Sequence, residues 1–237
     1  MQIVPVVDLL AGHAVRAVRG DRANYQPVES SLCRGSDPLV VGRALLDHCA
    51  GNTLYIADLD ALTGRGVQTP LLTELLQALP EVGIWLDAGF ASPPEAAAIL
   101  GALPEGGKRV VPVIASEALS AAESISEFTR RWPRALLSLD QRQGKALGAE
   151  SCWTASHLWP QKIIVMTLDR VGSFEGPDLA TVQEVQARAG SARTVIGAGG
   201  VRSVADLEAA ARAGVEAWLI ASALHDGRIP AGWSADH

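Results

Sequence analysis

Residues 194–222 read TVIGAGGVRSVADLEAAARAGVEAWLIAS, and this stretch decides the fold. It holds two short apolar runs, Thr194–Gly197 and Glu216–Ala221, on either side of the longer segment Ser203–Ala213, which has the character of a helix. The short runs are continuously apolar rather than alternating, which indicates strands buried on both faces, as in parallel sheets. We therefore interpret the stretch as one strand–helix–strand unit.

The same alternation runs through the rest of the chain. Apolar runs such as LYIA, VVPVIA and KIIVM predict eight strands in all, at Ile3–Asp8, Thr53–Asp58, Gly83–Asp87, Arg109–Ala115, Ala135–Asp140, Lys162–Thr167, Thr194–Gly197 and Glu216–Ala221. The segments between them predict helices at Pro38–Ala50, Thr69–Leu79, Pro93–Leu100, Leu119–Trp132, Asp178–Ala189 and Ser203–Ala213. Only a short helix fits within Glu150–Leu158, and little chain follows the last strand.

Several of these helices carry sequence signals for their first turn. Asp37 precedes a proline, which places a side-chain acceptor just before the first helical position. Ser92 and Glu95 have the spacing of a capping box, and Ser203 with Asp206 comes close to that pattern. These signals predict where the helices begin.

The alternation predicts the α/β class and one architecture in particular, a closed (β/α)8 TIM barrel that forms a single domain over residues 1–237. The alternative is an open, doubly wound sheet. That fold usually has a GxGxxG motif after its first strand, whereas this chain continues VVDLLAGHAVR from residue 6. No Pro-, Gly- or Ser-rich linker divides the chain.

The two halves of the sequence resemble each other. Leu59-Asp60 corresponds to Leu168-Asp169, and the residues from Asp87 (DAGFASPPE) correspond to those from Ala198 (AGGVRSVAD). A further match relates IAS at residues 114–116 to IAS at residues 220–222. Because the matches stay in register and fall at strand ends, they predict a barrel built from two duplicated half-barrels.

Composition excludes several classes of protein. The chain has 237 residues with 48% hydrophobic and 19% charged residues, so long disorder is excluded. The formal net charge of -6 argues against nucleic acid or an anionic membrane as a partner. No apolar run approaches the ~18 residues of a membrane span, and the first residues show no signal-peptide pattern, so we expect a cytoplasmic protein. Scattered cysteines and unpaired histidines predict no metal site.

Carboxylates gather where the predicted strands end. Asp8, Asp58, Asp87, Asp140 and Asp169 all stand at or just beyond a strand end, which is where barrel active sites lie. In a closed barrel the first and fifth strands are opposed, so Asp8 and Asp140 face each other across the mouth. Such a pair can act as base and acid on opposite ends of a substrate. The alternative for any one of these aspartates is an N-cap or a loop hydrogen bond.

The loops after the last two strands predict a phosphate site. They read GAGGVRSVADL from residue 197 and ASALHDGR from residue 221. Glycines let the backbone approach an anion, and the start of a helix supplies N–H donors. We expect backbone amides here to bind phosphate, with charge from one arginine; the candidates are Gly199, Gly200, Val201, Arg202, Ala221 and Ser222. Arg16 and Arg19, on the long segment after the first strand, are candidates to close over the substrate.

Taken together, these motifs resemble the HisA/HisF family of histidine-biosynthesis barrels. The resemblance rests on VVDLLAGHAVRAVRGD, ADLDA, LSLDQRQGK, LDRVGSFEGPD and the stretch from residue 197, and it covers nearly the whole chain. It implies a half-barrel duplication, a phosphorylated small substrate and no cofactor. It also implies catalytic aspartates at the ends of the first and fifth strands, which are Asp8 and Asp140 here.

The departures from the family pattern are informative. Where the family has a GGGIR-like phosphate loop after the third strand, this chain has Asp87 at its start and Ala91 at the arginine position. Glu117 adds an acid after the fourth strand, and Val171 replaces an acid in the loop after the sixth. A buried anion beside a phosphate is unfavourable. We therefore expect one phosphate, bound after the seventh and eighth strands, and an acidic end suited to an amine, a cation or a hydrogen-bonding heterocycle.

Three functions fit this pattern. The first is an isomerase-like enzyme acting on a phosphorylated aminosugar or ribosylamine, with Asp8 as base, Asp140 as acid and Asp169 orienting the substrate. The second is an enzyme of tetrahydromethanopterin or one-carbon cofactor biosynthesis. The LDRVG loop of this chain is similar to that of the HisA/HisF-related proteins associated with that pathway. The third is a non-catalytic barrel subunit that binds a phosphorylated ligand. The sequence makes no prediction of the oligomeric state.

Overall fold

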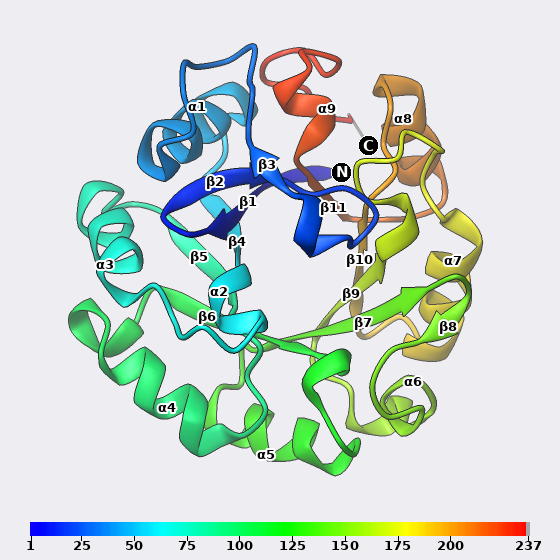
Figure 1. Cartoon of the computed structure of the whole chain (residues 1–237). Helices are drawn as coiled ribbons and strands as arrows, with labels where there is room; N and C mark the ends of the chain where they lie inside the picture. Colours follow the sequence, from blue (N-terminus) through cyan, green and yellow to red (C-terminus); the bar gives the residue numbers. More distant parts are fainter. Residues whose placement is uncertain (236–237) are drawn as a thin grey trace.

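The computed structural model describes residues 1–235, and it is a closed (β/α)8 barrel (Figure 1). The predicted single domain of 1–237 includes residues 236 and 237, which lie outside the described range. Eight parallel strands form a ring because the last pairs with the first; in ring order they are β1 (Gln2–Leu10), β4 (Thr53–Asp58), β5 (Gly83–Asp87), β6 (Val110–Ala115), β7 (Leu136–Arg142), β9 (Lys162–Thr167), β10 (Thr194–Ala198) and β11 (Ala217–Ile220). The predicted barrel is confirmed, and the open doubly wound sheet is wrong.

Most helices surround the ring on its outside, whereas the short α2 (Leu59–Leu62) lies over the mouth of the barrel (Figure 1). Their bounds are α1 (Pro38–Cys49), α2 (Leu59–Leu62), α3 (Thr69–Ala78), α4 (Pro93–Gly101), α5 (Glu123–Arg131), α6 (Ser151–Thr154), α7 (Leu179–Ala189), α8 (Val204–Arg212) and α9 (Ser222–His225). None of the helices in residues 1–235 has both the length and the apolar character needed to cross a membrane.

Most of the predicted elements are confirmed to within two residues at each end. The exception is the helix predicted to begin at Leu119, because α5 begins only at Glu123. Leu119 is extended, with φ −95° and ψ 137°, and its carbonyl oxygen accepts a hydrogen bond from the Ala149 N–H. This contact with a distant segment outweighs the local preference for a helix.

The predicted helix caps have mixed outcomes. Asp37 accepts hydrogen bonds from two backbone N–H groups of α1, and Ser92 accepts one from the Glu95 N–H, as predicted. The predicted cap at Ser203 is wrong, because the Ser203 side chain makes no capping hydrogen bond. Instead, the Asp206 carboxylate accepts a bond of 2.8 Å from the backbone N–H of Arg202.

Two antiparallel additions lie at the carboxyl side of the ring. β2 (His13–Arg16) turns back along β1 and pairs with β3 (Gln26–Pro27), and β8 (Lys145–Ala146) pairs with the end of β7. We name residues 17–25, between β2 and β3, the covering segment. Its residues Ala17 and Tyr25 pack in the same hydrophobic cluster as the inward-facing strand residues, so the segment lies over the inside of the barrel.

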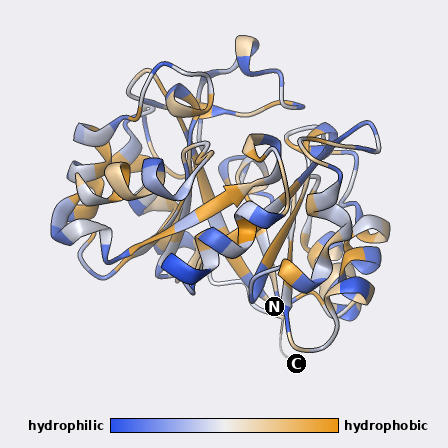
Figure 2. Cartoon of the chain, turned by 90° about the horizontal axis from the view of Figure 1, so that it is seen from below, coloured by the Kyte–Doolittle hydropathy of each residue, from blue (hydrophilic) through white to orange (hydrophobic). Residues whose placement is uncertain are grey.

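The hydrophobic residues form two layers. One cluster fills the barrel, with Val4, Tyr55, Val113 and Ile164 pointing inward, and the other fills the space between strands and helices. Figure 2 shows that the strands are mainly hydrophobic and that hydrophilic residues are concentrated on the helices. Side chains of successive strand residues point to opposite faces, so each parallel strand contributes to both layers.

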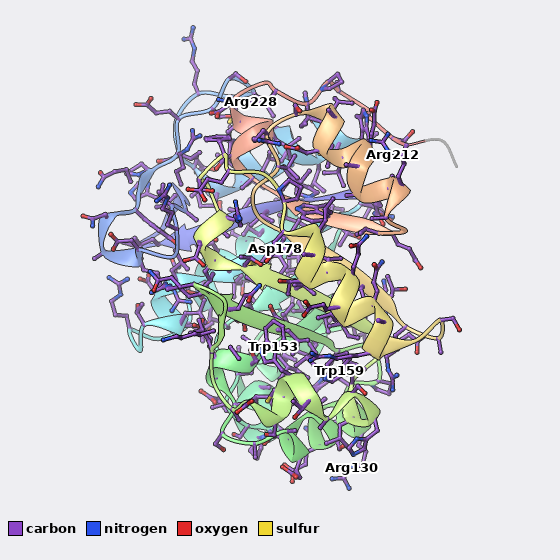
Figure 3. The ribbon with its side chains drawn as sticks, turned by 90° about the vertical axis from the view of Figure 1, so that its right-hand side faces the viewer. Arg130, Trp153, Trp159, Asp178, Arg212 and Arg228 are labelled. Atoms are coloured by element: carbon purple, nitrogen blue, oxygen red, sulfur yellow. The ribbon has the colours of Figure 1, made fainter. Side chains whose placement is uncertain are left out.

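The tryptophans serve packing rather than forming an exposed patch. Trp159 is buried, and its indole N–H donates a bond of 2.7 Å to the Cys152 carbonyl. Trp153 and Trp233 are partly buried against the outer cluster. Figure 3 shows Trp153 and Trp159 on one side of the molecule, at the level of the lower strands and helices. Within residues 1–235, Trp153, Trp159 and Trp233 therefore form no exposed apolar patch of the kind that binds a partner subunit.

Candidate active site

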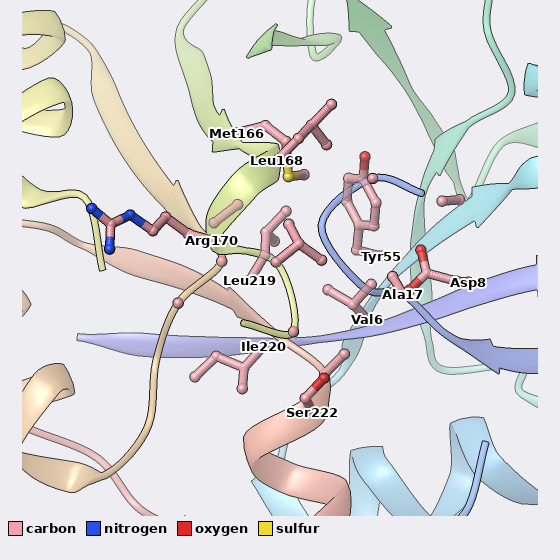
Figure 4. A pocket seen from close by; sticks show the side chains of 18 of the residues that line it. Val6, Asp8, Ala17, Tyr55, Met166, Leu168, Arg170, Leu219, Ile220 and Ser222 are labelled. Carbon is pink, nitrogen blue, oxygen red and sulfur yellow. The ribbon is translucent and has the colours of Figure 1, made fainter. Parts of the chain in front are cut away.

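A cavity opens at the carboxyl ends of the barrel strands. It is lined by residues from around the ring, among them Asp8 of β1, Asp87 of β5, Asp140 of β7, Gly200 after β10 and Ser222 at the start of α9. Figure 4 shows Asp8 and Ser222 on its wall. The cavity therefore lies where the sequence placed the candidate site.

Asp8 and Asp140 come from opposite sides of the ring. Their strands, β1 and β7, are separated by three other strands in either direction around the barrel. Both side chains nevertheless line the same cavity. The predicted juxtaposition of these two aspartates is thus present in the structure, and a molecule in the cavity would lie between them.

Asp140 is held in a small buried network. It is 5% exposed, and its carboxylate accepts hydrogen bonds from the Ser138 hydroxyl at 2.7 Å and the Ser116 hydroxyl at 3.2 Å. Ser116 also accepts a bond of 2.9 Å from the Asp140 backbone N–H. The two serines come from different strand ends, so they fix the orientation of the carboxyl group within the cavity.

Burial raises the pKa of the aspartates in the cavity. Desolvation raises the pKa of Asp140 to about 8, with the Ser138 hydrogen bond opposing this change and the charge of Asp87 adding to it. Desolvation raises the pKa of Asp8 to about 7, where Arg22 opposes the change and Asp87 adds to it. At neutral pH Asp140 is therefore mostly protonated, and Asp8 is close to half ionised. The pair has the protonation states of an acid and a base.

Asp87 and Glu117 line one end of the cavity, which we call the acidic end. Two further residues, Tyr55 and Arg22, contact them there, and the sequence did not indicate either. Asp87 is 6% exposed and accepts hydrogen bonds of 3.2 Å from the Tyr55 hydroxyl and from the Gly89 N–H. Burial raises the pKa of Asp87 to about 6. Glu117 accepts a hydrogen bond from the Arg22 guanidinium, which the covering segment brings into the cavity.

The glycine loops line the side of the cavity opposite β5 and β6. Gly199, Gly200, Val201, Ala221 and Ser222 are all part of its wall. At Gly200 the backbone has φ +83°, and an added Cβ would lie 2.2 Å from the carbonyl oxygen of residue 176. The loop therefore requires glycine both for its conformation and for its close approach to the neighbouring loop.

Two of the arginines predicted for the site, Arg16 and Arg202, are directed to other side chains of the same chain rather than into the cavity. Arg202 makes two side-chain bonds, of 2.9 and 2.7 Å, to the Asp206 carboxylate. Arg16 makes a bidentate pair with Asp226, both bonds being 2.9 Å, and its guanidinium lies over the Phe174 ring. Neither arginine lines the cavity, so the structure does not bring them together with the aspartate pair.

Asp58 and Asp169 also lie outside the cavity lining. Asp58 is fully buried, caps α2 through the Ala61 N–H at 3.1 Å, and accepts a bond of 2.7 Å from the Gln68 N–H. Asp169 accepts a hydrogen bond from the Gln143 N–H and lines a neighbouring depression with Arg142. Asp58 is therefore a helix N-cap, which the sequence left open as the alternative to a role in the active site.

Sequence reasoning missed several residues of the cavity. Ser138 could have been found, because it stands two residues before Asp140 and so shares its face of β7. Tyr55 has the same relation to the barrel interior on β4. Arg22 and Tyr25 carry no such signal, since the covering segment has no periodic pattern that fixes where its side chains point.

These features define the class of the protein, a (β/α)8 barrel with two opposed buried aspartates and glycine loops at the carboxyl ends of its strands. The chain belongs to the histidine biosynthesis protein family, which it matches over residues 2–230. The resemblance found in the sequence is confirmed. In residues 1–235 no three Cys, His, Asp or Glu side chains gather in a way that could hold a metal ion.

Relatives are similar over nearly their whole length. An uncharacterized protein of Methanocaldococcus jannaschii is 29% identical, with 96% of this chain and 94% of the relative covered. The 1-(5-phosphoribosyl)-5-((5-phosphoribosylamino)methylideneamino) imidazole-4-carboxamide isomerase of Paracoccus denitrificans is 31% identical, with 97% of this chain and 96% of the relative covered. The isomerase of the same name from Synechococcus sp. strain WH7803 is 31% identical, with 98% and 91% covered.

Proposed function

We propose that this protein is an isomerase-like enzyme that acts on a phosphorylated aminosugar or ribosylamine. Asp140 is the general acid and Asp8 is the general base. The observation that carries the proposal is that both aspartates line one cavity from opposite sides, with pKa values raised to about 8 and about 7. An acid and a base poised near neutral pH are most effective at moving protons.

The arrangement suits the rearrangement of an aminoaldose to an aminoketose. Protonated Asp140 gives its proton to the ring oxygen as the C1–oxygen bond breaks, and the nitrogen lone pair forms the imine. Ionised Asp8 then removes the proton from C2, and the electron pair of that C–H bond forms an enamine. Tautomerisation of the enamine yields the ketone, and the two carboxyl groups exchange their protonation states. Asp169, on the rim beside this cavity, is proposed to orient the substrate.

The phosphate of the substrate is placed at the glycine loops. Gly200, Val201 and Ser222 line the cavity there, and their backbone amides are proposed to bind the phosphate oxygens. This mode of binding explains how an acidic protein binds an anion, because the donors are backbone groups. Arg202 lies next to the same loop, but its guanidinium is paired with the Asp206 carboxylate, so the backbone amides are proposed as the main phosphate donors.

The substrate is proposed to differ from that of the isomerases that this chain resembles. Asp87 and Glu117 line the end where a second phosphate would lie, and carboxylates there repel a phosphate. Val171 lines the cavity at a position where the family pattern has an acid, and Ala91 lies outside the lining. The second candidate, an enzyme of tetrahydromethanopterin or one-carbon cofactor biosynthesis, is favoured by the same acidic end, which suits the N–H groups of a pterin or aryl amine.

The proposal is tested with N-aryl ribosylamine 5-phosphates, formed in solution from ribose 5-phosphate and aryl amines. In D₂O we expect solvent exchange to place deuterium at C1 of the aminoketose product, because C1 is protonated when the enamine tautomerises to the ketone; proton NMR detects it. Asp8→Asn and Asp140→Asn should each slow this exchange at least ~100-fold, whereas Asp47→Asn, an exposed position on α1, should leave it unchanged. Wild-type exchange rates in both active-site variants would refute the acid–base assignment, and turnover of the relatives' bisphosphate substrate would refute the substrate assignment.

A further inference from the structure

The acidic end of the cavity has more carboxyl groups than cationic groups. Asp8, Asp87, Glu117 and Asp140 all line it, and within residues 1–235 the lining supplies only Arg22 and Arg170 as cations. The Arg170 guanidinium donates to the Glu175 carbonyl at 3.2 Å and to the Glu175 carboxylate at 3.4 Å, a carboxylate that it shares with Arg19, so Arg170 is directed to Glu175 rather than to the acidic end. Arg22 alone remains for the four carboxyl groups.

The raised pKa values have the same origin. Burial is the largest cause for Asp8, Asp87 and Asp140, and the charge of a neighbouring carboxylate raises the pKa further in each case. A group of carboxyl groups in this state binds a positive charge favourably, because a cation offsets both the repulsion and the lost hydration. The cavity therefore has an electrostatic preference for a cation at this end.

A second observation, independent of the carboxyl groups, also points to a ligand. Tyr25 of the covering segment is only 9% exposed and lines the cavity. Within residues 1–235 its hydroxyl makes no hydrogen bond, and it is not one of the enclosed side-chain atoms that lack a partner, so it retains some exposure. The hydroxyl is thus available to a polar group in the cavity. Burial and the charge of Asp8 raise its pKa, so it stays protonated.

Arg22 shows which kind of group this end accommodates. Its planar guanidinium enters the cavity from the covering segment and donates a hydrogen bond to Glu117. It also lies within electrostatic range of Asp8 and Asp87. A planar cation with several N–H donors already fits beside these carboxylates, and carboxylates bind such groups in bidentate fashion.

We propose that the acidic end binds a cationic nitrogen group of the substrate, an amidinium or a group of that shape, with Asp87 as its main acceptor and Tyr25 as a second contact. The inference rests on the proposed function in that the cavity is the same. It assigns Asp87 to substrate recognition rather than to proton transfer. Because β5 and β6 lie across the ring from β10 and β11, the substrate spans the barrel mouth, with its phosphate at one end and its nitrogen group at the other.

The test uses separate probes for the two ends, acetamidinium for the acidic end and inorganic phosphate for the glycine loops. Binding is followed at pH 8 through backbone amide shifts of a ¹⁵N-labelled protein, with Gly89 and Gly200 as reporters. We expect acetamidinium to shift the Gly89 signal and to bind about tenfold more tightly than neutral acetamide. Asp87→Asn should weaken acetamidinium binding about tenfold and Tyr25→Phe about threefold. Asp47→Asn should have no effect.

The outcomes separate this inference from the proposed function. Equal binding of acetamidinium and acetamide, or unchanged acetamidinium binding in Asp87→Asn, would overturn the cation site even if phosphate still binds at Gly200. Loss of phosphate binding with intact acetamidinium binding would instead remove the phosphate site of the proposed function and leave the cation site standing. Tyr25→Phe removes one hydroxyl only, so it tests the site even if Asp87→Asn fails to fold.

Discussion

Replacing Asp140 by asparagine should stabilise the fold above neutral pH while it removes the proposed general acid. The pKa of Asp140 is raised from 3.8 to about 8, so the folded state binds a proton more tightly than the unfolded chain. For a carboxyl group whose pKa is raised in this way, stability is lost as the pH rises from 3.8 and is at its lowest above about 8. Asparagine resembles the protonated acid in shape and carries no charge at any pH.

The size of the effect follows from the change in pKa. A tenfold change in the proton-binding constant corresponds to about 1.4 kcal/mol, so keeping Asp140 protonated in the fold at pH 7 costs roughly 4 kcal/mol relative to the unfolded chain. Between pH 5 and pH 8 the advantage of asparagine over aspartate should grow by roughly 4 kcal/mol. The Ser116 and Ser138 hydroxyl groups can accept from the new amide as well as donate to it, so the local network survives the change.

The assay is urea unfolding of wild type and Asp140→Asn at pH 5 and pH 8, with Asp47→Asn as the control for an exposed aspartate. We expect the midpoint of the variant to rise relative to wild type on going from pH 5 to pH 8, with the control unchanged. A variant that is destabilised by the same amount at both pH values would refute the reasoning. Asp140 would then be stabilised as an anion, and its role as an acid would have no basis.

Two further outcomes test other parts of the structure. Gly200→Ala should destabilise the protein by about 2 kcal/mol or more, because φ is +83° and the new Cβ would lie 2.2 Å from the carbonyl oxygen of residue 176. The same change should abolish the amide shifts that phosphate causes at this loop. Thermal unfolding measures the first effect and phosphate titration the second, and an unchanged melting temperature contradicts the expectation. Arg22→Met should increase the mobility of the covering segment, because it removes the hydrogen bond from Arg22 to Glu117. Limited proteolysis would detect this as faster cleavage within residues 17–25. Equal cleavage rates would show that other contacts hold the segment.

The barrel could be predicted from the sequence because its decisive features are local. Each parallel strand is a short apolar run, and the strands β4, β5 and β9 begin and end where the sequence predicts. A strand that is buried on both faces consists almost wholly of apolar residues, so it is easy to recognise in the sequence. The start of α5 could not be predicted, because the conformation of Leu119 depends on a backbone bond to Ala149, which lies beyond the next strand.

The candidate site could be predicted only where the backbone determines the position of a residue. Asp8, Asp140 and Gly200 are placed in the cavity by the ends of their strands, independently of distant partners. Long side chains are different. Arg16 reaches Asp226 from the other end of the chain, and Arg202 turns to Asp206, so in each case the partner and not the strand decides where the guanidinium points. Arginine candidates on loops are for this reason the least predictable part of such a site.

The free-energy cost of burying the carboxyl groups in the cavity indicates what role they have. Desolvation raises the pKa values of Asp8, Asp87 and Asp140, and the free energy that this requires must come from the packing of the two hydrophobic layers. Native proteins are stable by only about 5–15 kcal/mol, so three such groups are a large burden for a single cavity. Two other aspartates, Asp37 and Asp58, cap helices through backbone N–H groups instead. This cost supports the two proposals made above, that the carboxyl groups at the mouth of the barrel exchange protons with the substrate and that they bind its positive charge.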